Sequence, residues 1–234
     1  QLSAKSIVAI ARLVGAETCL VPEHLEPSVQ RALEGEGLAL LSLATDGTFP
    51  WCPSASEQDS TAAGEPRSSR LFIATSGTTA EPKLLVIRGD ALWSSSLAFV
   101  GQHGFLDAEA RFYNVLPMSY LGGLFNLGLI PLAAGGSVVV SEAFSGASQL
   151  SFWNEVERFQ VNVLWLTPTM ARGLLAIRRR MRERVTDGLR VPLRAALLGM
   201  APIDLPTKQA FETEFAVPVL ENYGISETTF LATE

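Results

Sequence analysis

A short segment of this chain gathers hydroxyl side chains, a glycine and a lysine directly after an apolar run. The run, residues 71–74, is expected to form a buried strand. The glycine lets the backbone turn, so that consecutive N–H groups and the hydroxyls can face an anion, and the lysine adds a positive charge. These features favour a phosphate-binding loop, whose contacts would come from Thr75, Ser76, Gly77, Thr78, Thr79 and Lys83.

The same segment has a simpler interpretation as a hydroxyl-rich turn before Pro82. It is not a Walker loop, because the chain has no Gly-x-x-x-x-Gly-Lys-Ser/Thr pattern. A second apolar run follows at residues 84–87, so the loop would join two strands. The strands on either side and Lys83 favour a nucleotide site over a plain turn.

Polar side chains and glycines recur where other expected strands end. Tyr120, Gly199 and Asn222 each follow a different apolar run. In parallel α/β sheets, ligands collect at the carboxyl ends of the strands. These positions therefore predict one shared ligand site.

The elements that would position these residues alternate between helix and strand along the chain. Such alternation predicts an α/β fold with a mainly parallel sheet covered by helices on both faces. Helices are expected at residues 3–13, 27–33, 90–100, 121–133, 149–159, 169–180 and 204–215. Strands are expected at residues 18–21, 38–43, 71–74, 84–87, 112–116, 137–140, 161–166, 193–198 and 217–220.

A polar stretch rich in Ser, Pro, Ala and Gly, residues 45–70, is expected to be a flexible loop. It would separate an α/β segment at residues 1–44 from an α/β core at residues 71–234.

The composition narrows the class of protein. The 234 residues are 47% hydrophobic, enough for a substantial core, and their net charge of −6 argues against nucleic acid as a partner. Glycine and proline interrupt the longest apolar run, residues 121–140, so we expect no membrane span. Cys19 and Cys52 are the only cysteines, which gives no disulfide framework, and the N-terminus lacks a signal-peptide pattern. We therefore expect a cytoplasmic protein.

Four segments resemble signature motifs of the adenylate-forming superfamily, in the family's order. That superfamily contains acyl-CoA synthetases, acyl-AMP ligases, luciferases and adenylation domains. Residues 75–83 resemble Thr-Ser-Gly-Thr-Thr-Gly-x-Pro-Lys, with Ala80 in place of a glycine. Residues 116–123, 199–203 and 221–227 resemble Leu-Pro-Leu-Phe-His-x-x-Gly, Gly-Gly-Ala-Pro-Leu and Asn-Tyr-Gly-x-Thr-Glu. The resemblance covers nearly the whole chain and implies the α/β fold of the family's N-terminal domain.

The resemblance also implies ATP and Mg²⁺ as cofactors, with Lys83, Tyr120 and Glu227 as catalytic residues. Glu227 would bind Mg²⁺, an ion that prefers carboxylate oxygens. Tyr223 would stack on adenine, with the amide of Asn222 nearby, and Tyr120 would take an aromatic gate position where many relatives carry histidine. The remaining nucleotide contacts would come from Gly199, Met200, Ala201, Gly224 and Ser226.

Each of these residues also has an ordinary structural interpretation. Glu227 could be a surface glutamate, Tyr223 a core ring and Tyr120 a space-filling loop aromatic. Met200 takes the place of the motif's second glycine, and its larger, flexible side chain is expected to narrow the pocket or shift the nucleotide. Ser226 keeps the hydroxyl of the usual threonine.

The implied reaction is ATP-dependent activation of a carboxylic acid to an acyl-adenylate, for transfer to CoA or to the thiol of an acyl or peptidyl carrier protein. Relatives that activate amino acids carry an aspartate soon after the aromatic position. Residues 121–124 carry no charge, which favours a small carboxylic acid without an α-amino group. A non-catalytic nucleotide- or acid-binding or interaction module is the alternative, suggested by Ala80 and Met200. A Ser-His-Asp hydrolase is disfavoured, because the chain lacks a nucleophile elbow.

Family members continue past the last of these motifs to a ribose-binding aspartate, a hinge and a mobile C-terminal lid. The chain ends at Glu234. We therefore expect it to represent the nucleotide- and acid-binding core of the N-terminal domain without the lid, and to bind ligands without completing adenylation on its own.

Overall fold

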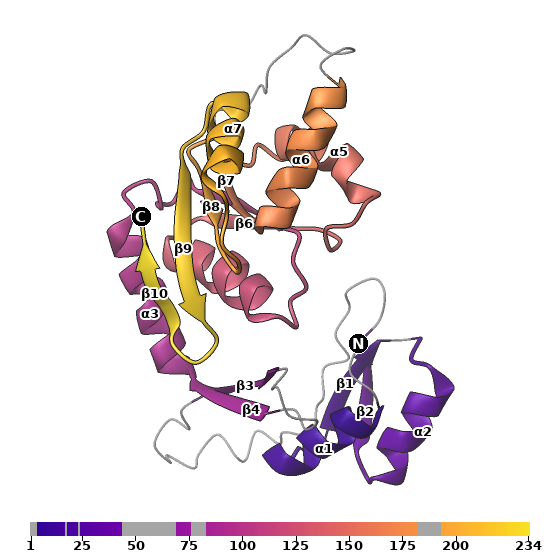
Figure 1. Cartoon of the computed structure of the whole chain (residues 1–234). Helices are drawn as coiled ribbons and strands as arrows, with labels where there is room; N and C mark the ends of the chain where they lie inside the picture. Colours follow the sequence, from indigo (N-terminus) through magenta and orange to yellow (C-terminus); the bar gives the residue numbers. More distant parts are fainter. Residues whose placement is uncertain (1–3, 17, 23, 44–68, 76–82, 182–192) are drawn as a thin grey trace. The chain divides into compact units, whose positions relative to one another are not determined.

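The computed structural model describes residues 4–16, 18–22, 24–43, 69–75, 83–181 and 193–234 (Figure 1). These residues separate into two compact units, Gln1–Val86 and Ile87–Glu234. The flexible loop predicted at residues 45–70 lies almost entirely outside the described residues. The domain boundaries drawn from the sequence stay predictions.

The first unit contains a parallel pair of strands and two helices. Its small core consists of Ala11, Val21, Leu33 and Leu38, with partly buried apolar residues around them. A second pair of strands, β3 (Arg70–Thr75) and β4 (Lys83–Arg88), forms its own two-stranded sheet. The other elements are α1 (Ala4–Val14), β1 (Thr18–Pro22), α2 (Pro27–Gly35) and β2 (Ala39–Leu43).

A six-stranded sheet forms the centre of the second unit, in the order β10-β9-β8-β7-β5-β6. Neighbouring strands run parallel except at one edge, where β10 pairs antiparallel with β9. The strands are β5 (Arg111–Asn114), β6 (Ser137–Val140), β7 (Val163–Leu166), β8 (Ala195–Leu198), β9 (Val219–Ile225) and β10 (Thr229–Thr233).

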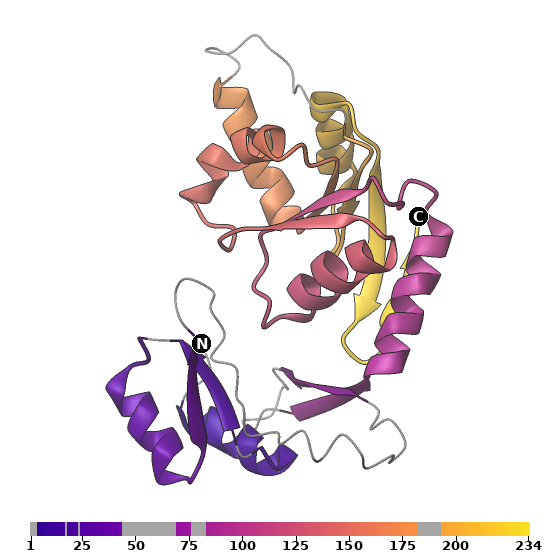
Figure 2. The same cartoon turned by 180° about the vertical axis from the view of Figure 1, so that it is seen from behind.

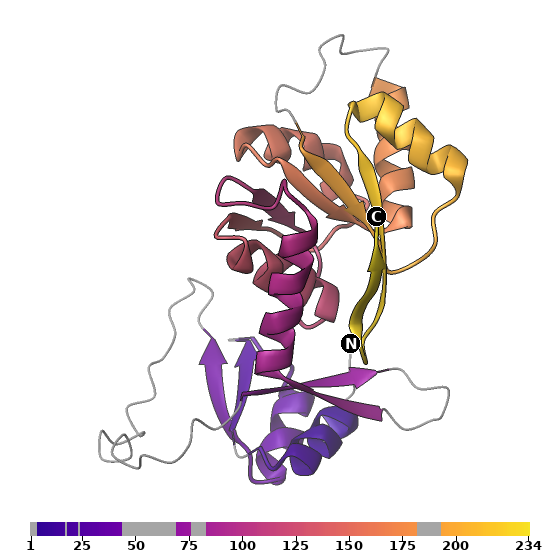
Figure 3. The same cartoon turned by 90° about the vertical axis from the view of Figure 1, so that its left-hand side faces the viewer.

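Helices cover both faces of this sheet, with α3 on one side and α7 on the other (Figures 2 and 3). Every residue of β7 and β8 is buried, because alternate side chains enter opposite helical layers. Leu164 and Leu166 join the core that α5, α6 and α7 cover, whereas Trp165 stacks on Phe99 of α3 at 5.2 Å between ring centroids. The predicted α/β fold, with a mainly parallel sheet covered on both faces, is confirmed. The helices are α3 (Gly89–Gln102), α4 (Ile130–Ala133), α5 (Ser148–Arg158), α6 (Pro168–Met181) and α7 (Leu205–Phe215).

The segment predicted as one helix at residues 121–133 forms a π-helix, η2 (Gly122–Leu129), followed by α4. Its first turn packs tightly against the preceding loop: a Cβ atom added at Gly123 would lie 2.3 Å from the carbonyl oxygen of Pro117. Asn114 at the end of β5 also anchors this turn, because its Nδ2 donates a hydrogen bond of 3.0 Å to the carbonyl of Gly123. π-Helical turns are rare and often lie at functional sites.

The sequence prediction was wrong about the end of the sheet. Asn222, Tyr223 and Gly224 lie inside β9 instead of following it, and β10 was not predicted. The two strands form a hairpin that extends β9, so its polar residues pair with β10. Gly224 is required there, because a Cβ atom would lie 2.0 Å from the carbonyl oxygen of Thr229.

Within the described part of the chain, no helix has both the length and the apolar character that crossing a membrane requires.

Candidate functional site

A cavity of about 650 Å³ opens in the second unit between the end of β8 and the β9–β10 hairpin. It brings together residues that the sequence analysis selected from two separate motifs, Met200 and Ala201 from one and Asn222, Tyr223 and Gly224 from the other. Most of the remaining lining is apolar, from Leu198, Pro202, Ile203, Ile225 and Ala232, and Glu221, Thr233 and Glu234 complete it.

The turn that follows β8 forms one wall of the cavity. Gly199 approaches the next strand so closely that an added Cβ atom would lie 3.0 Å from the carbonyl oxygen of Asn222. Met200 then adopts a left-handed backbone conformation with φ of 70°, which L-residues other than glycine seldom take. A glycine would adopt this conformation without strain, which explains the glycine of the motif at this position. Met200 adopts the left-handed conformation although it carries a side chain.

The side chain of Met200 reaches the loop that carries Tyr120. A Cβ atom added at Gly122 would lie 3.1 Å from Met200 Sδ and 2.7 Å from Tyr120 Cε1. The thioether and the ring thus lie against the same glycine at the start of η2. Tyr120 is 46% exposed and does not line the cavity itself. The structure brings Tyr120 and Met200 together, as the shared-site prediction requires.

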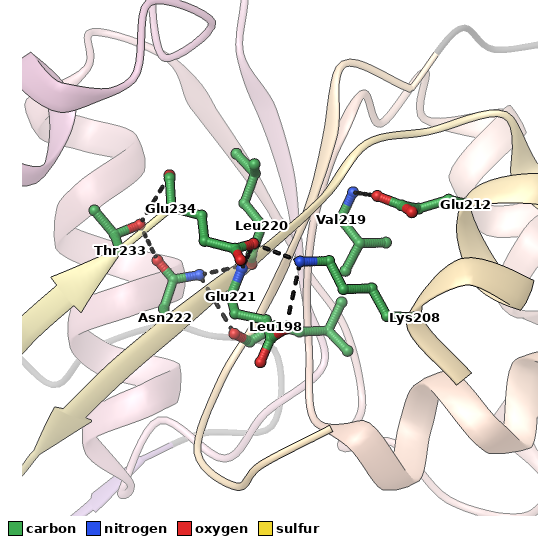
Figure 4. Close-up of polar contacts among 9 residues, drawn as sticks. All are labelled: Leu198, Lys208, Glu212, Val219, Leu220, Glu221, Asn222, Thr233 and Glu234. Atoms are coloured by element: carbon green, nitrogen blue, oxygen red, sulfur yellow. Dashed lines mark hydrogen bonds and ion pairs between the residues drawn. The ribbon is translucent and has the colours of Figure 1, made fainter. Parts of the chain in front are cut away.

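Asn222 is a buried residue of the cavity lining, and its amide hydrogen-bonds to the backbone of β8 and β9 (Figure 4). Its Nδ2 donates to the carbonyl of Leu220 at 3.1 Å and to that of Leu198 at 3.4 Å. Its Oδ1 accepts a hydrogen bond of 2.7 Å from the hydroxyl of Thr233 on β10. Asn222 therefore joins β8, β9 and β10 at the floor of the cavity.

His103 extends this network and was missed by the sequence analysis. It caps the end of α3, is 5% exposed, and its Nε2 lies 2.9 Å from Thr233 Oγ1. Its ring packs between Phe99 and Phe105, with centroids 4.6 and 5.3 Å away. Burial lowers the pKa of His103 below its usual value, so the ring is neutral near pH 7. No local motif surrounds His103, and its partner lies 130 residues along the chain, so no sequence signal pointed to it.

Tyr223 borders the cavity, whereas Ser226 and Glu227 are not among its lining residues. Tyr223 lines it with a side chain that is 62% exposed, which leaves the ring face available to a ligand. Ser226 and Glu227 follow in the turn between β9 and β10, where Glu227 is exposed. Among the residues that the structure describes, no three His, Cys, Asp or Glu side chains gather as a metal site. A carboxylate such as Glu227 fits an ion held mainly by phosphate oxygens and water.

A largely buried lysine side chain pairs with two carboxylates of the cavity lining, Glu221 and Glu234 (Figure 4). The side chain of Lys208 on α7 is 14% exposed and pairs with Glu221 at 3.3 Å and with Glu234. Burial opposes the charge on Lys208, but its hydrogen bonds with Glu234 and Glu221 raise its pKa. The Lys208 hydrogen bond and the backbone N–H of Glu221 lower the pKa of Glu234. Both carboxylates are engaged by Lys208, which fixes their position in the cavity wall.

The predicted phosphate loop is only partly described. Ser76, Gly77, Thr78 and Thr79 lie outside the described residues. Thr75 ends β3 and Lys83 begins β4, so the loop joins two paired strands, as the two apolar runs indicated. The prediction that the first of these strands is buried was wrong, because β3 belongs to a two-stranded sheet in which Phe72 is 41% exposed.

Comparisons with known proteins identify the family of this chain. The family model described as AMP-binding enzyme matches residues 1–234, the whole chain. The chain belongs to this family. Among its curated relatives is a sulfoacetate–CoA ligase of Cupriavidus necator, 28% identical over 207 residues, or 87% of this chain and 38% of that protein. An oxalate–CoA ligase of Arabidopsis thaliana is 29% identical over 168 residues, or 71% of this chain and 31% of that protein.

Solved structures of other proteins share the fold of this chain. ATP-bound MatB from Rhodopseudomonas palustris matches with a TM-score of 0.73 and 21% identity, over 100% of this chain and 45% of that one. The o-succinylbenzoate CoA synthetase MenE from Bacillus subtilis, in complex with ATP and magnesium, matches with a TM-score of 0.71 and 21% identity, over 100% and 45%. The chain thus spans less than half the length of these relatives.

Proposed function

We propose that this chain is the nucleotide- and acid-binding part of an enzyme that uses ATP to activate a carboxylic acid as an acyl-adenylate, for transfer to CoA. The observation that carries the proposal is the cavity in which the Gly199–Ala201 turn faces Asn222, Tyr223 and Gly224. Membership of the AMP-binding family supports the nucleotide, and the CoA ligases among its relatives support CoA as acceptor. A carrier-protein thiol is the second possible acceptor.

The cavity suits a purine base with a polar edge. Its walls are mainly apolar, and the exposed ring of Tyr223 offers a face on which a base can stack. Asn222 supplies a buried amide at the cavity floor. We assign adenine to this cavity, between Tyr223 and the backbone of the Gly199–Ala201 turn.

The acid would lie beside Met200, on the side that faces Gly122 and Tyr120. Met200 occupies space that a glycine would leave open, and Tyr120 can swing because nearly half of it is exposed. Residues 121–124 carry no charge that could pair with an α-amino group. We therefore propose a small carboxylic acid that is not an α-amino acid.

Phosphate charge would be neutralised by the loop from Thr75 to Thr79, by Lys83 and by the carboxylate-bound ion at Glu227. When bound, Mg²⁺ would stabilise charge that develops on the phosphate oxygens as pyrophosphate leaves. Glu227 would hold this ion with one carboxylate, and Lys83 would contact a phosphate directly. These roles rest on the motif match and stay proposals.

Acid-dependent exchange of pyrophosphate into ATP tests the function. The assay uses the full-length gene product and a panel of acids that covers sulfonated, dicarboxylic, aliphatic, aromatic and α-amino acids. We expect exchange with at least one small acid lacking an α-amino group. A protein that binds ATP but shows no exchange with any acid would support the alternative, a non-catalytic binding module. A protein that binds no ATP would refute the proposed function and a nucleotide-binding module alike.

A further inference from the structure

The amide of Asn222 has a fixed orientation, and the reason lies outside the motif that contains it. Both hydrogens of Nδ2 point at backbone carbonyls, those of Leu198 and Leu220, which can only accept. The amide oxygen must then be the atom that faces Thr233. Because an amide oxygen only accepts, the hydroxyl of Thr233 must donate to it.

This assignment also fixes the proton on His103. The hydroxyl of Thr233 has a single hydrogen, and Asn222 takes it. The contact of 2.9 Å with His103 then requires Nε2 to carry a hydrogen and donate to Thr233 Oγ1. The buried ring is thus the Nε2–H tautomer, and hydrogen bonds run in one direction from His103 to Thr233 to Asn222.

We infer that His103, acting through Thr233, is a positioning residue that keeps the amide of Asn222 oriented so that it offers only an acceptor to the cavity. The inference rests on the proposed function, in which Asn222 contacts the base. With both Nδ2 hydrogens committed, the unused hydrogen-bonding capacity of the amide is a lone pair on Oδ1. Such a group favours a purine with an amino group at C6, which donates, over one with a carbonyl there, which accepts.

The hydroxyl of Thr233 has a second acceptor within reach, which competes with Asn222 for its hydrogen. The carbonyl oxygen of Glu234 lies 3.5 Å from Thr233 Oγ1, against 2.7 Å for Asn222 Oδ1. A donor from His103 polarises the hydroxyl and strengthens the hydrogen bond that it makes to Asn222. Loss of that donor weakens the restraint that Thr233 places on the amide. Loss of the hydroxyl removes this restraint and leaves only the two hydrogen bonds of Nδ2 to the carbonyls of Leu198 and Leu220.

The test compares binding of ATP and ITP: the base of ITP has a carbonyl at C6 in place of the amino group and, as a consequence, a hydrogen on N1. Titrations use the wild-type protein, Thr233→Val, His103→Phe and the double variant, with thermal melts to check folding. Phenylalanine keeps a ring against Phe99 and Phe105 but cannot donate. Ser95→Ala is the matched control, because Ser95 pairs with Thr229 across the same two elements, α3 and β10, away from the cavity.

We expect the wild type to prefer ATP. Thr233→Val should lower the ATP-to-ITP preference about fivefold, the typical effect of one neutral hydrogen bond, and His103→Phe should lower it by less. In the double variant, His103→Phe should add nothing to Thr233→Val, because the hydroxyl through which it acts is gone. Ser95→Ala should keep the wild-type preference. Additive effects, or an unchanged preference in Thr233→Val, would overturn the inference.

A measurement on the wild type separates this inference from the proposed function. The ¹⁵N spectrum of the imidazole rings reports the tautomer directly, and His24→Gln assigns the signals, since His24 and His103 are the histidines of this chain. We expect a neutral Nε2–H ring at His103 whether or not a nucleotide binds. An Nδ1–H ring would refute the hydrogen-bond direction. Failure of the wild type to bind ATP, with the Nε2–H ring present, would instead refute the proposed function.

Discussion

Replacing Met200 with glycine is expected to relieve backbone strain and to widen the cavity at the same time. The backbone φ of Met200 is 70°, a left-handed conformation that brings Cβ too close to the following carbonyl oxygen. That crowding costs roughly 1–2 kcal/mol for a residue with a Cβ atom. Met200→Ala is the matched control, because alanine also removes the thioether but keeps Cβ and therefore the strain.

The size of the effect follows from these two variants. Met200→Gly removes the strain, which raises the free energy of unfolding by roughly 1–2 kcal/mol relative to alanine. Glycine also makes the unfolded chain more flexible, which lowers the free energy of unfolding by about 0.4–1 kcal/mol. The net difference should make Met200→Gly more stable than Met200→Ala by about 0.5–1 kcal/mol. For a domain of this size, that corresponds to a melting temperature about 2 °C higher.

Differential scanning calorimetry of the two variants measures this difference. An alanine variant that melts at or above the glycine variant would refute the claim of strain at this position. The same proteins test the role of the side chain: both variants should accept bulkier acids, with a lower KM for them, because both open the space beside Gly122. Unchanged acid preference in both would show that Met200 does not shape the acid site.

Two further predictions concern the predicted catalytic residues and the π-helix. Lys83→Ala and Glu227→Gln should each lower the rate of acid activation about a hundredfold, about 3 kcal/mol of barrier, and wild-type rates in both would refute their roles. Gly122→Ala should fold normally but change the KM for the acid, because its Cβ atom would press on the movable side chains of Tyr120 and Met200. Gly123→Ala would meet the backbone of Pro117 and should lose about 3 kcal/mol of stability in a urea titration; equal stability of the two glycine variants would contradict this reasoning.

The regular part of the fold was predictable because it depends on local patterns. β6 lies at residues 137–140 as predicted, and β7 and β8 form within longer apolar runs that any parallel, doubly covered sheet requires. The π-helix was not predictable from the sequence. An apolar segment with helical periodicity does not reveal whether each N–H will bond to the carbonyl four residues earlier or to the one five residues earlier. The close approach of Gly123 to Pro117 in the first turn of this helix is likewise not encoded by sequence spacing.

The β9–β10 hairpin was missed for a related reason. Gly224 resembled a loop residue, yet its lack of a side chain serves the close approach to Thr229 within the hairpin. The site prediction placed Met200 and Asn222 at one ligand site, and both residues line the same cavity, although Asn222 lies inside β9 and does not follow its end. His103 could not be found this way, since it contributes through a contact with Thr233 that only the folded chain creates.

The most direct test of the central claim is a crystal structure of the protein with a non-hydrolysable acyl-adenylate mimic. The account predicts adenine in the cavity between Tyr223 and the Gly199–Ala201 turn, with its amino group on Oδ1 of Asn222 and the acyl group beside Met200. A mimic bound elsewhere, or a protein that does not bind it at all, would contradict the assignment of this cavity as the nucleotide site.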